Sequence, residues 1–440
     1  MTNLSRLSID NTNLTSTGIG KNGVSDDDVI ALSPKLDSLR NRIQKWIDSR
    51  QPTFLNLPFT NNLDEIKEKG QDIAHNFKRT VVFGIGGSSL GGEMLVRTLG
   101  DSSPKNTVSF YDNVDPSTMV ELEKVDWHET LLLVISKSGN TAETLSQFLT
   151  ILPVMEHDLG FSKAKEHILF ITENKEGALY QLSKELKIEV IEHPPVGGRF
   201  SVLSVVGLLP AYVGGVDIEG VMEGARSMVQ RCATKNILDN PAFYNGAVQY
   251  LHAEQKRTIS VVMPYADNLR FVVNWFRQLW AESLGKIDKN GVHKGLTPTE
   301  AHGVTDQHSQ LQLLLEGPDD KLVTFITDPG FRFRGRRIPM QFKDIPAIAP
   351  LAGHTIGELF LAELKATRTT LSRRGRPNRT LALLERDAYA LGELIILLEM
   401  ETVVVAELMG VDPFDQPAVE ESKVLTREYL SDISSVSDLI

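Results

Sequence analysis

Short apolar runs alternate with longer stretches of helical periodicity along most of the chain. Five of these runs are rich in Val, Ile, Leu, Phe and Thr and precede residue 192, and two more follow in the second half. The predicted strands are 80–83, 107–111, 130–135, 165–171, 188–191, 258–263 and 321–327. Strands separated by helices predict parallel sheets that helices cover on both faces. The pattern therefore predicts an α/β fold.

Boundary signals define several of the helices. Ser33 and Pro34 open a helix to about residue 48, and Pro241 opens another. Apolar periodicity predicts further helices over 269–286, 356–370 and 391–408. The last is very apolar and ends before Gly410, a residue suited to a left-handed C-terminal cap.

The length of 440 residues predicts more than one domain, because a single core stops growing near roughly 250–300 residues. We expect a first α/β domain over 61–215 and a second over 216–405. An N-terminal arm and helix (1–60) precede them, and a helical tail (406–440) follows. The polar segment 1–30 is expected to form a loose arm. The basic stretch 372–379 is expected to be a solvated loop.

Composition narrows the class of protein. A net charge of −11 and a pI of about 5.5 argue against nucleic acid or an anionic membrane as the main partner, although one pocket can still bind a small anion. The lone Cys232 excludes an intrachain disulfide and a cysteine-based metal site, and is expected to be a core thiol. We find no signal peptide and no apolar run of about 18 residues. A soluble cytoplasmic protein is expected.

One carboxylate stands on an otherwise apolar stripe. Phe271, Trp275, Leu279 and Glu282 follow one another at spacings of four, four and three in the predicted helix 269–286. Burial among apolar side chains would raise the pKa of Glu282 toward the range useful for proton transfer. The alternative is a carboxylate at a helix end that reaches water and pairs with Lys286 one turn later.

Two polar turns follow predicted strands directly. Residues 84–92 (GIGGSSLGG) combine glycines with the start of a helix, but they match neither a dinucleotide fingerprint nor a P-loop. Residues 136–144 (SKSGNTAET) place three hydroxyls and a lysine at a strand end where a helix begins. A helix N-cap explains only one of these hydroxyls, so we favour an anion site of the kind that binds a phosphate monoester. In open parallel sheets both turns would lie at the ligand-binding edge.

Two further segments carry candidate chemistry. In 196–201 (VGGRFS), two glycines give Arg199 room to reach inward, where a fixed cation could stabilise an oxyanion; a surface turn is the alternative. In 301–310 (AHGVTDQHSQ), a histidine in a polar run could act in acid–base chemistry. His302 and His308 are six residues apart, a spacing that does not favour a metal site.

Taken together, the segments resemble the glucose-6-phosphate isomerase family in its bacterial form. The matching blocks occur in the order of the family: 84–92, 136–144, GGRFSVLS at 197–204, QLWAESLGK at 278–286, TDQHSQLQLL at 305–314 and FDQPAVEESK at 414–423. The chain departs from the family pattern at Ala418, where Gly is usual, and at Pro194–Pro195, where an acidic residue is common.

The resemblance implies two sugar-isomerase (SIS) domains, usually in a homodimer whose subunits both contribute to each site. It implies reversible conversion of glucose 6-phosphate and fructose 6-phosphate without metal or organic cofactor. Glu282 matches the proton-transfer base, Arg199 the enediolate stabiliser, and His308 and Lys423 the groups assigned to ring opening. The positions that match substrate contacts are Gly87, Ser88, Ser136, Lys137, Ser138, Thr141, Gln278 and Gln416.

Two other functions remain open from the sequence. The first is a related isomerase of broader specificity, for example one that also accepts mannose 6-phosphate. The second is a non-catalytic sugar-phosphate sensor built on SIS domains. A sensor needs the phosphate loop but not Glu282, Arg199, His308 and Lys423 together, and a DNA-binding regulator would also carry a basic helix-turn-helix module, which we do not find.

Overall fold

Two five-stranded sheets form the framework of the chain. The computed structural model describes residues 5–49, 51–100, 105–173 and 176–432. In the first sheet all neighbouring strands are parallel, in the order β3-β2-β4-β5-β6. Its strands are β2 (Arg79–Phe83), β3 (Thr107–Tyr111), β4 (Thr130–Ile135), β5 (Ile168–Thr172) and β6 (Glu189–Glu192). Each coincides with a predicted strand within three residues at either end.

Alternating side chains of the first sheet enter two separate cores, because successive residues of a strand point to opposite faces. Val81, Phe83, Leu132 and Val134 pack with α7, α8 and α10, whereas Val82 and the intervening residues of β4 face α5, α6 and α11. The helices of this unit are α5 (Leu63–Asn76), α6 (Leu90–Leu99), α7 (Pro116–Leu122), α8 (Ala142–Leu159), α9 (Phe161–Ala164), α10 (Ala178–Leu186) and α11 (Val205–Val213).

The second sheet is parallel apart from one edge. Its order is β1-β12-β11-β7-β10, and only β1 runs antiparallel to its neighbour. The strands are β1 (Leu7–Asp10), β7 (Ile259–Tyr265), β10 (Thr297–Glu300), β11 (Lys321–Thr327) and β12 (Asn378–Leu383), and β8 (Lys286–Ile287) pairs with β9 (His293–Lys294) in a separate two-stranded ribbon. The prediction of two parallel α/β units is confirmed.

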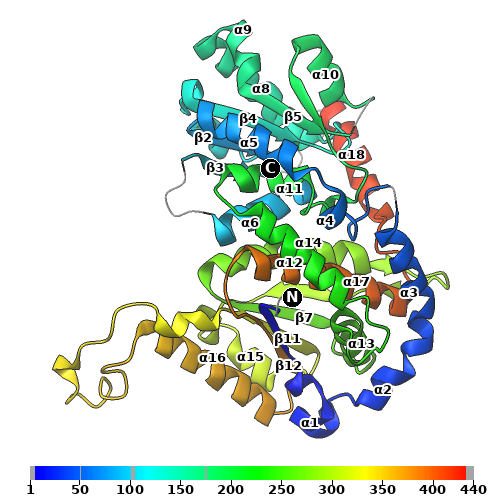
Figure 1. Cartoon of the computed structure of the whole chain (residues 1–440), viewed down its shortest axis with the longest axis vertical. Coiled ribbons are helices and arrows are strands. Elements are labelled where there is room, and N and C mark those ends of the chain that lie inside the picture. The colour runs from blue at the N-terminus through cyan, green and yellow to red at the C-terminus, as the bar shows by residue number, and fades with distance from the viewer. Residues whose placement is uncertain (1–4, 50, 101–104, 174–175, 433–440) are drawn as a thin grey trace.

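The inner faces of the two sheets share one hydrophobic core. This core contains Leu133 of β4, Val262 of β7 and Leu381 of β12, with buried residues of the helices between them. Figure 1 shows α12, α14 and α17 in this central layer. The helices of the second unit are α12 (Ile218–Arg231), α13 (Pro241–Glu254), α14 (Arg270–Leu284), α15 (Leu311–Glu316), α16 (Ile356–Arg373) and α17 (Ala388–Met409). Gly410 ends α17 in the left-handed conformation, as predicted.

The N-terminal segment does not form a loose arm. From residue 5 onward it folds as β1, α1 (Ser16–Ile19) and α2 (Asp26–Ala31), followed by α3 (Ser33–Ile47) and α4 (Leu57–Thr60). Apolar residues that are sparse but well spaced, among them Leu7, Leu14 and Val24, are buried in the main core. The polar composition concealed these anchors, and the expectation of a loose arm is wrong for the described residues.

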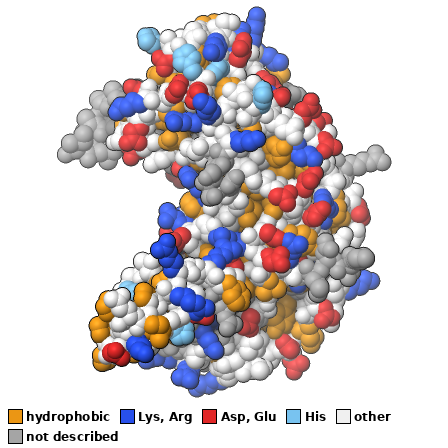
Figure 2. All heavy atoms as spheres, turned by 60° about the vertical axis from the view of Figure 1, so that its left-hand side comes forward, with side chains coloured by type: hydrophobic (Ala, Val, Ile, Leu, Met, Phe, Trp, Pro, Cys, Tyr) orange, Lys and Arg blue, Asp and Glu red, His pale blue; other side chains and the backbone are white. Residues whose placement is uncertain are grey.

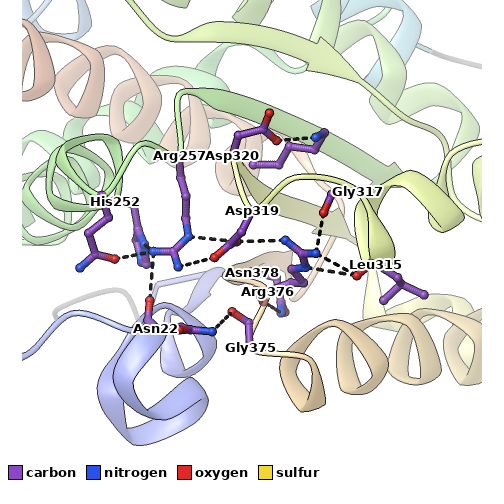
Figure 3. A network of polar contacts seen from close by, with 12 residues as sticks. Asn22, His252, Arg257, Leu315, Gly317, Asp319, Asp320, Gly375, Arg376 and Asn378 are labelled. Carbon is purple, nitrogen blue, oxygen red and sulfur yellow. Dashed lines mark hydrogen bonds and ion pairs between the residues drawn. The ribbon is translucent and has the colours of Figure 1, made fainter.

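A buried polar network holds this segment to the second unit (Figure 3). The ring of His252 donates from Nε2 to the backbone oxygen of Leu14 at 2.9 Å, and its Nδ1 lies 3.1 Å from Arg257. Arg257 donates to the backbone oxygen of Asn22 and pairs with Asp319 at 2.8 Å. Because the carbonyl of Leu14 and the guanidinium fix one nitrogen as donor and the other as acceptor, the ring is neutral.

The stretch 372–379 is only in part the solvated basic loop that we expected. Arg379 belongs to β12 and is 1% exposed, and it makes a bidentate ion pair with the fully buried Glu401 of α17 at 2.8 Å. The partner belongs to a different element and could not be read from the local sequence. The basic cluster therefore contributes one cation to the core.

Two segments project from the main body. Residues 329–355 form a long excursion before α16, and α18 (Glu420–Ser431) follows the chain toward its C-terminus (Figure 1). Every described residue of α18 is exposed, and the excursion exposes Met340, Phe342 and Ile345 by about half. Figure 2 shows a deep notch on the face where the excursion comes forward. In the described part of the chain, no helix combines the length and hydropathy needed to cross a bilayer.

Candidate functional site

Arg199 and Glu282 meet between the two units. Arg199 lies in a short turn after the first sheet, and Glu282 lies in the last turn of α14. Nη1 of the arginine is 3.0 Å from Oε2 of the glutamate, and Nε donates to the hydroxyl of Ser283 at 2.9 Å. Arg199 is 2% exposed, and burial lowers its pKa while the charge of Glu282 opposes that shift. The pair thus places a carboxylate beside a buried cation.

The environment of Glu282 differs from the one predicted. Trp275 and Leu279 on the same stripe are buried, but the side chain of Glu282 remains 31% exposed. Its Oε1 accepts from Nε2 of Gln278 at 3.2 Å, one turn earlier. An ion pair and an amide therefore surround the carboxylate, and the expected apolar enclosure is wrong. The alternative partner, Lys286, pairs instead with Asp415 at 3.1 Å.

The glycine-rich turn after β2 packs directly on this cluster. Gly86 has a φ of +58°, and a Cβ there would lie 2.8 Å from Nε2 of Gln278. A Cβ on Gly87 would lie 2.2 Å from the carbonyl carbon of Gly198. Gly86 therefore requires glycine for its left-handed backbone, and Gly87 because no side chain fits against the backbone of Gly198. Ser88 completes the same turn and is half-buried.

The loop before α18 closes the site from the C-terminal side. Gln416 accepts a hydrogen bond from Nη1 of Arg199, and the backbone oxygen of Asp415 accepts from Nη2 at 2.9 Å. Phe414 anchors this loop, because its ring lies 5.3 Å from that of Phe200 and 5.4 Å from that of Trp46. Arg199 therefore connects segments that lie far apart in the sequence.

The predicted phosphate loop forms a second cluster at the end of β4. The hydroxyls of Ser136 and Thr141 lie 2.9 Å apart, and Ser136 is 2% exposed. Thr141 occupies the N-cap position of α8, but its side chain caps no backbone N–H of the helix. The first turn of α8 therefore keeps its donors and its positive dipole end available for an anion.

The remaining residues of this loop shape its backbone. The hydroxyl of Ser138 accepts from the backbone N–H of Asn140 at 3.2 Å, and Lys137 pairs with Glu173 at 3.6 Å. In the order β3-β2-β4, the connection from β2 leads to β3 on one side of β2, and the connection from β3 leads to β4 on the other side. The glycine-rich turn and the phosphate loop thus flank a topological switch point, where ligands of open α/β sheets bind.

Two of the predicted site residues lie elsewhere. His308 is exposed just before α15, and among the described residues no side chain forms a hydrogen bond or ion pair with its ring. α15 packs with α16, away from the first unit (Figure 1). Lys423 lies on exposed α18 and pairs with Glu420 at 2.7 Å. The roles of both residues stay predictions.

Sequence reasoning did not predict the contacts of three residues that hold the cluster together. Ser283 directly follows Glu282 and accepts from Arg199, Lys286 donates to the backbone oxygen of Asp412 at 2.6 Å, and Phe414 anchors the loop. All three occur inside the quoted blocks, but their neighbours come from distant segments.

In the described part of the chain, no group of three or more His, Cys, Asp or Glu side chains is arranged to hold a metal ion.

Comparison with known proteins identifies relatives of the chain. Residues 58–328 match the phosphoglucose isomerase family. The glucose-6-phosphate isomerase of Carboxydothermus hydrogenoformans is 39% identical, with 96% of this chain and 94% of that protein aligned. The crystal structure of a hypothetical protein from Thermus thermophilus superimposes with a TM-score of 0.85 at 32% identity, covering 96% of this chain and 99% of that one.

A more distant structure shares the fold. The glucose-6-phosphate isomerase of Chlamydia trachomatis has a TM-score of 0.79 at 20% identity, covering 96% of this chain and 92% of that one. The long alignment with the Carboxydothermus enzyme, at 39% identity, shows common ancestry over nearly the whole chain. The chain belongs to the phosphoglucose isomerase family.

Proposed function

We propose that the protein reversibly isomerises D-glucose 6-phosphate and D-fructose 6-phosphate through an enediol or enediolate, the step that serves glycolysis and gluconeogenesis. The membership of the family supports this activity. The observation that carries it in this chain is the contact between Glu282 and the buried Arg199, 3.0 Å apart and beside the topological switch point.

Glu282 would move the proton between the two carbons. In aldose–ketose isomerisation, the proton leaves C2 of the aldose and returns to C1, or the reverse. One carboxylate can serve both atoms because they are adjacent. General-base catalysis of this kind contributes roughly 10²- to 10⁴-fold. The partial exposure of Glu282 leaves one side of the carboxylate open to a substrate.

Arg199 would stabilise the charge that develops on the oxygens of the intermediate. Its guanidinium is held by Ser283 and by the loop at 413–416, so that it needs little reorganisation when charge appears. Gln278, Gln416, Gly87 and Ser88 would contact the sugar. No step in this chemistry calls for a metal or an organic cofactor, and we propose none.

The phosphate group would bind to the loop formed by Ser136, Lys137, Ser138 and Thr141. Uncommitted donors at the start of α8 and the Ser136–Thr141 hydroxyl pair support this assignment. Binding a remote phosphate fixes the sugar relative to Glu282, and binding energy is thereby used for orientation.

We further propose a homodimer in which the partner completes the site. His308 is exposed, and α18 with Lys423 has no buried residue in this chain. Apolar side chains on the excursion and on α18 form surfaces of the kind that bind another protein. His308 and Lys423 would then assist ring opening.

We also propose residues 61–215 and 216–405 as the two SIS domains, and the cytoplasm as the location.

A coupled assay tests the activity directly. Purified protein should convert fructose 6-phosphate to glucose 6-phosphate without added metal, detected by reduction of a nicotinamide cofactor in a dehydrogenase reaction. Mannose 6-phosphate, tested in parallel, measures substrate breadth. Turnover no higher than the background rate would refute the proposed activity.

Subunit mixing tests the shared site. Glu282→Gln and His308→Ala should each be inactive alone. If Glu282 and His308 of different subunits form one site, a random mixture restores one intact site in each heterodimer, or about a quarter of wild-type activity. Light scattering should give twice the monomer mass. No recovery after verified subunit exchange would refute the shared site.

A further inference from the structure

His193 is a buried histidine with an unused ring nitrogen next to the phosphate loop. Its side chain follows β6 and is 1% exposed. Nδ1 lies 2.7 Å from the backbone oxygen of Pro194 and donates its proton there, because a carbonyl can only accept. The other nitrogen, Nε2, is buried and has no hydrogen-bond partner among the described residues. Most buried polar atoms are satisfied, so this acceptor needs an explanation.

Sheet register places His193 in a row with two charged residues. Ile135 of β4 pairs with Ile171 of β5, and Thr172 pairs with Glu192 of β6. Two positions beyond Ile135–Ile171, and one beyond Thr172–Glu192, this register aligns Lys137, Glu173 and His193. We call these three residues the strand-end row. The backbone N–H of Glu173 donates to the oxygen of Lys137 at 2.9 Å, and that of His193 donates to Thr172 at 3.0 Å.

The row therefore spans adjacent strands, which lie about 4.8 Å apart. Lys137 belongs to the phosphate loop and pairs with Glu173 at 3.6 Å. Glu173 stands between the lysine and the histidine. The side chains of Lys137 and Glu173 are 37% and 42% exposed. Both side chains therefore have room to change partners.

Burial and the charge of Lys137 favour the neutral ring of His193 when the site is free. Burial lowers its pKa first, and the ammonium of Lys137 lowers it further. The hydrogen bond to the backbone oxygen of Pro194 raises the pKa, and the charge of Glu173 raises it as well. On its own strand, Glu192 is exposed to solvent. Of the charged groups that act on the ring, Lys137 opposes a second proton and Glu173 favours one.

We propose that His193 is a positioning residue of the phosphate site, and that it takes up a proton when a phosphate monoester binds to the 136–141 loop. This inference rests on the proposed function. The incoming dianion attracts Lys137 away from Glu173 and leaves that carboxylate without its cation. A proton from solvent then forms an N–H bond at Nε2, which donates to Glu173.

The proton uptake has two effects on the site. It keeps Glu173 paired, so Lys137 remains with the phosphate. It also keeps the bond from Nδ1 to Pro194, whose carbonyl additionally accepts from the N–H of Val196 at 2.7 Å. That tight turn leads into the Gly197–Gly198–Arg199 segment. His193 thereby connects the phosphate loop with the turn that carries Arg199.

Competitive inhibition by sulfate tests this coupling. Sulfate stays dianionic between pH 6 and pH 8, so any change in its inhibition constant comes from the protein. By reciprocal linkage, the wild type should bind sulfate about 5- to 10-fold more tightly at pH 6 than at pH 8. In His193→Asn, the amide nitrogen can still donate to Pro194, but the titrating nitrogen is gone. Its inhibition constant should lose this pH dependence.

Calorimetry supplies a second measurement and further variants. Sulfate binding in two buffers of different ionisation enthalpy should show net proton uptake by the wild type at pH 7 and a clear loss of uptake in His193→Asn. Glu173→Gln, which removes the partner of the new N–H, should reduce the uptake as well. His157→Asn is the matched control, because His157 is exposed on α8 and should leave the uptake intact.

Two outcomes would overturn the inference. One is an active wild type whose sulfate inhibition is independent of pH, or absent. The other is a His193→Asn enzyme that retains the pH dependence of the wild type. These results differ from a failure of the proposed function, in which the wild type shows no isomerisation in the coupled assay at any pH.

Discussion

His252 makes the attachment of the N-terminal segment sensitive to acid. The ring is 0% exposed, and its single donor and single acceptor are both engaged, with Leu14 and Arg257. Burial is the main cause that lowers its pKa from 6.5 to about 4, and the charge of Arg257 adds to it. A second proton would replace the acceptor at Nδ1 with a donor that faces the guanidinium (Figure 3).

The direction of the effect follows from linkage. The unfolded chain binds a proton to His252 below about pH 6.5, whereas the folded protein does so only near pH 4. The contribution of neutral His252 to the free energy of unfolding is therefore fully present well above pH 6.5. It is lost as the pH falls from about 6.5 to about 4. The loss from this residue is about 1.4 kcal/mol at pH 5.5 and about 2.5 kcal/mol at pH 4.5.

Urea denaturation of the wild type and His252→Gln, measured at pH 7.5, 5.5 and 4.5, isolates this contribution. Glutamine can still donate to Leu14, but it does not titrate. The variant should be less stable at pH 7.5 by about 1.5–3 kcal/mol, because the flexible amide does not reproduce the fixed donor and acceptor of the ring, and Arg257 is left with a poorer acceptor. At pH 4.5 that deficit should be smaller by roughly 2.5 kcal/mol, so that the variant is about as stable as the wild type or more stable. A deficit that stays constant across the three pH values would refute the reasoning.

Three further results are expected. Glu282→Gln should lower kcat by about 10²- to 10⁴-fold in the coupled assay, while the protein still binds a substrate analogue. Glu300→Gln, at the ion pair with Arg277, should retain activity. A near-wild-type rate in Glu282→Gln would exclude Glu282 as the base. Thr141→Val should raise KM by about 10- to 100-fold through loss of a hydrogen bond to the phosphate, and an unchanged KM would argue against the phosphate loop. Arg379→Met should cost about 3–5 kcal/mol in urea denaturation because Glu401 is left buried without its cation, and a loss below about 1 kcal/mol would contradict this.

Much of the framework could be predicted because the relevant signals are local. Seven strands were recognised from short apolar runs, and the polar turns after β2 and β4 were placed at the ligand edge from their position alone. The short strands β1, β8 and β9 were not recognised, and neither were β10 and β12. The last two show why. The first is a short polar edge strand (TPTE), and the second begins within a basic stretch. In both, tertiary pairing overrides weak local preference.

Contacts between distant segments account for what the sequence did not reveal. Motif order identified Arg199, Glu282, Gln278 and Gln416 as candidates, and the structure brings all four together. Nothing in a linear sequence shows that the loop at 413–416 encloses the arginine. Likewise, the apolar periodicity of its helix predicted an apolar enclosure for Glu282. That periodicity carries no information about a cation from a distant segment such as Arg199.

The pairing of β1 with β12 determines when the chain can finish folding. Leu7 lies opposite Leu383, so β1 has no partner until the chain as far as β12 has left the ribosome. Contacts of such large sequence separation form late and slowly. Until β1 has paired with it, β12 presents an open edge, the kind of strand that aggregates with other chains. We therefore expect removal of residues 1–10 to lower the yield of soluble protein during synthesis. The loss of free energy of unfolding in the folded protein should be small by comparison, because few contacts are lost.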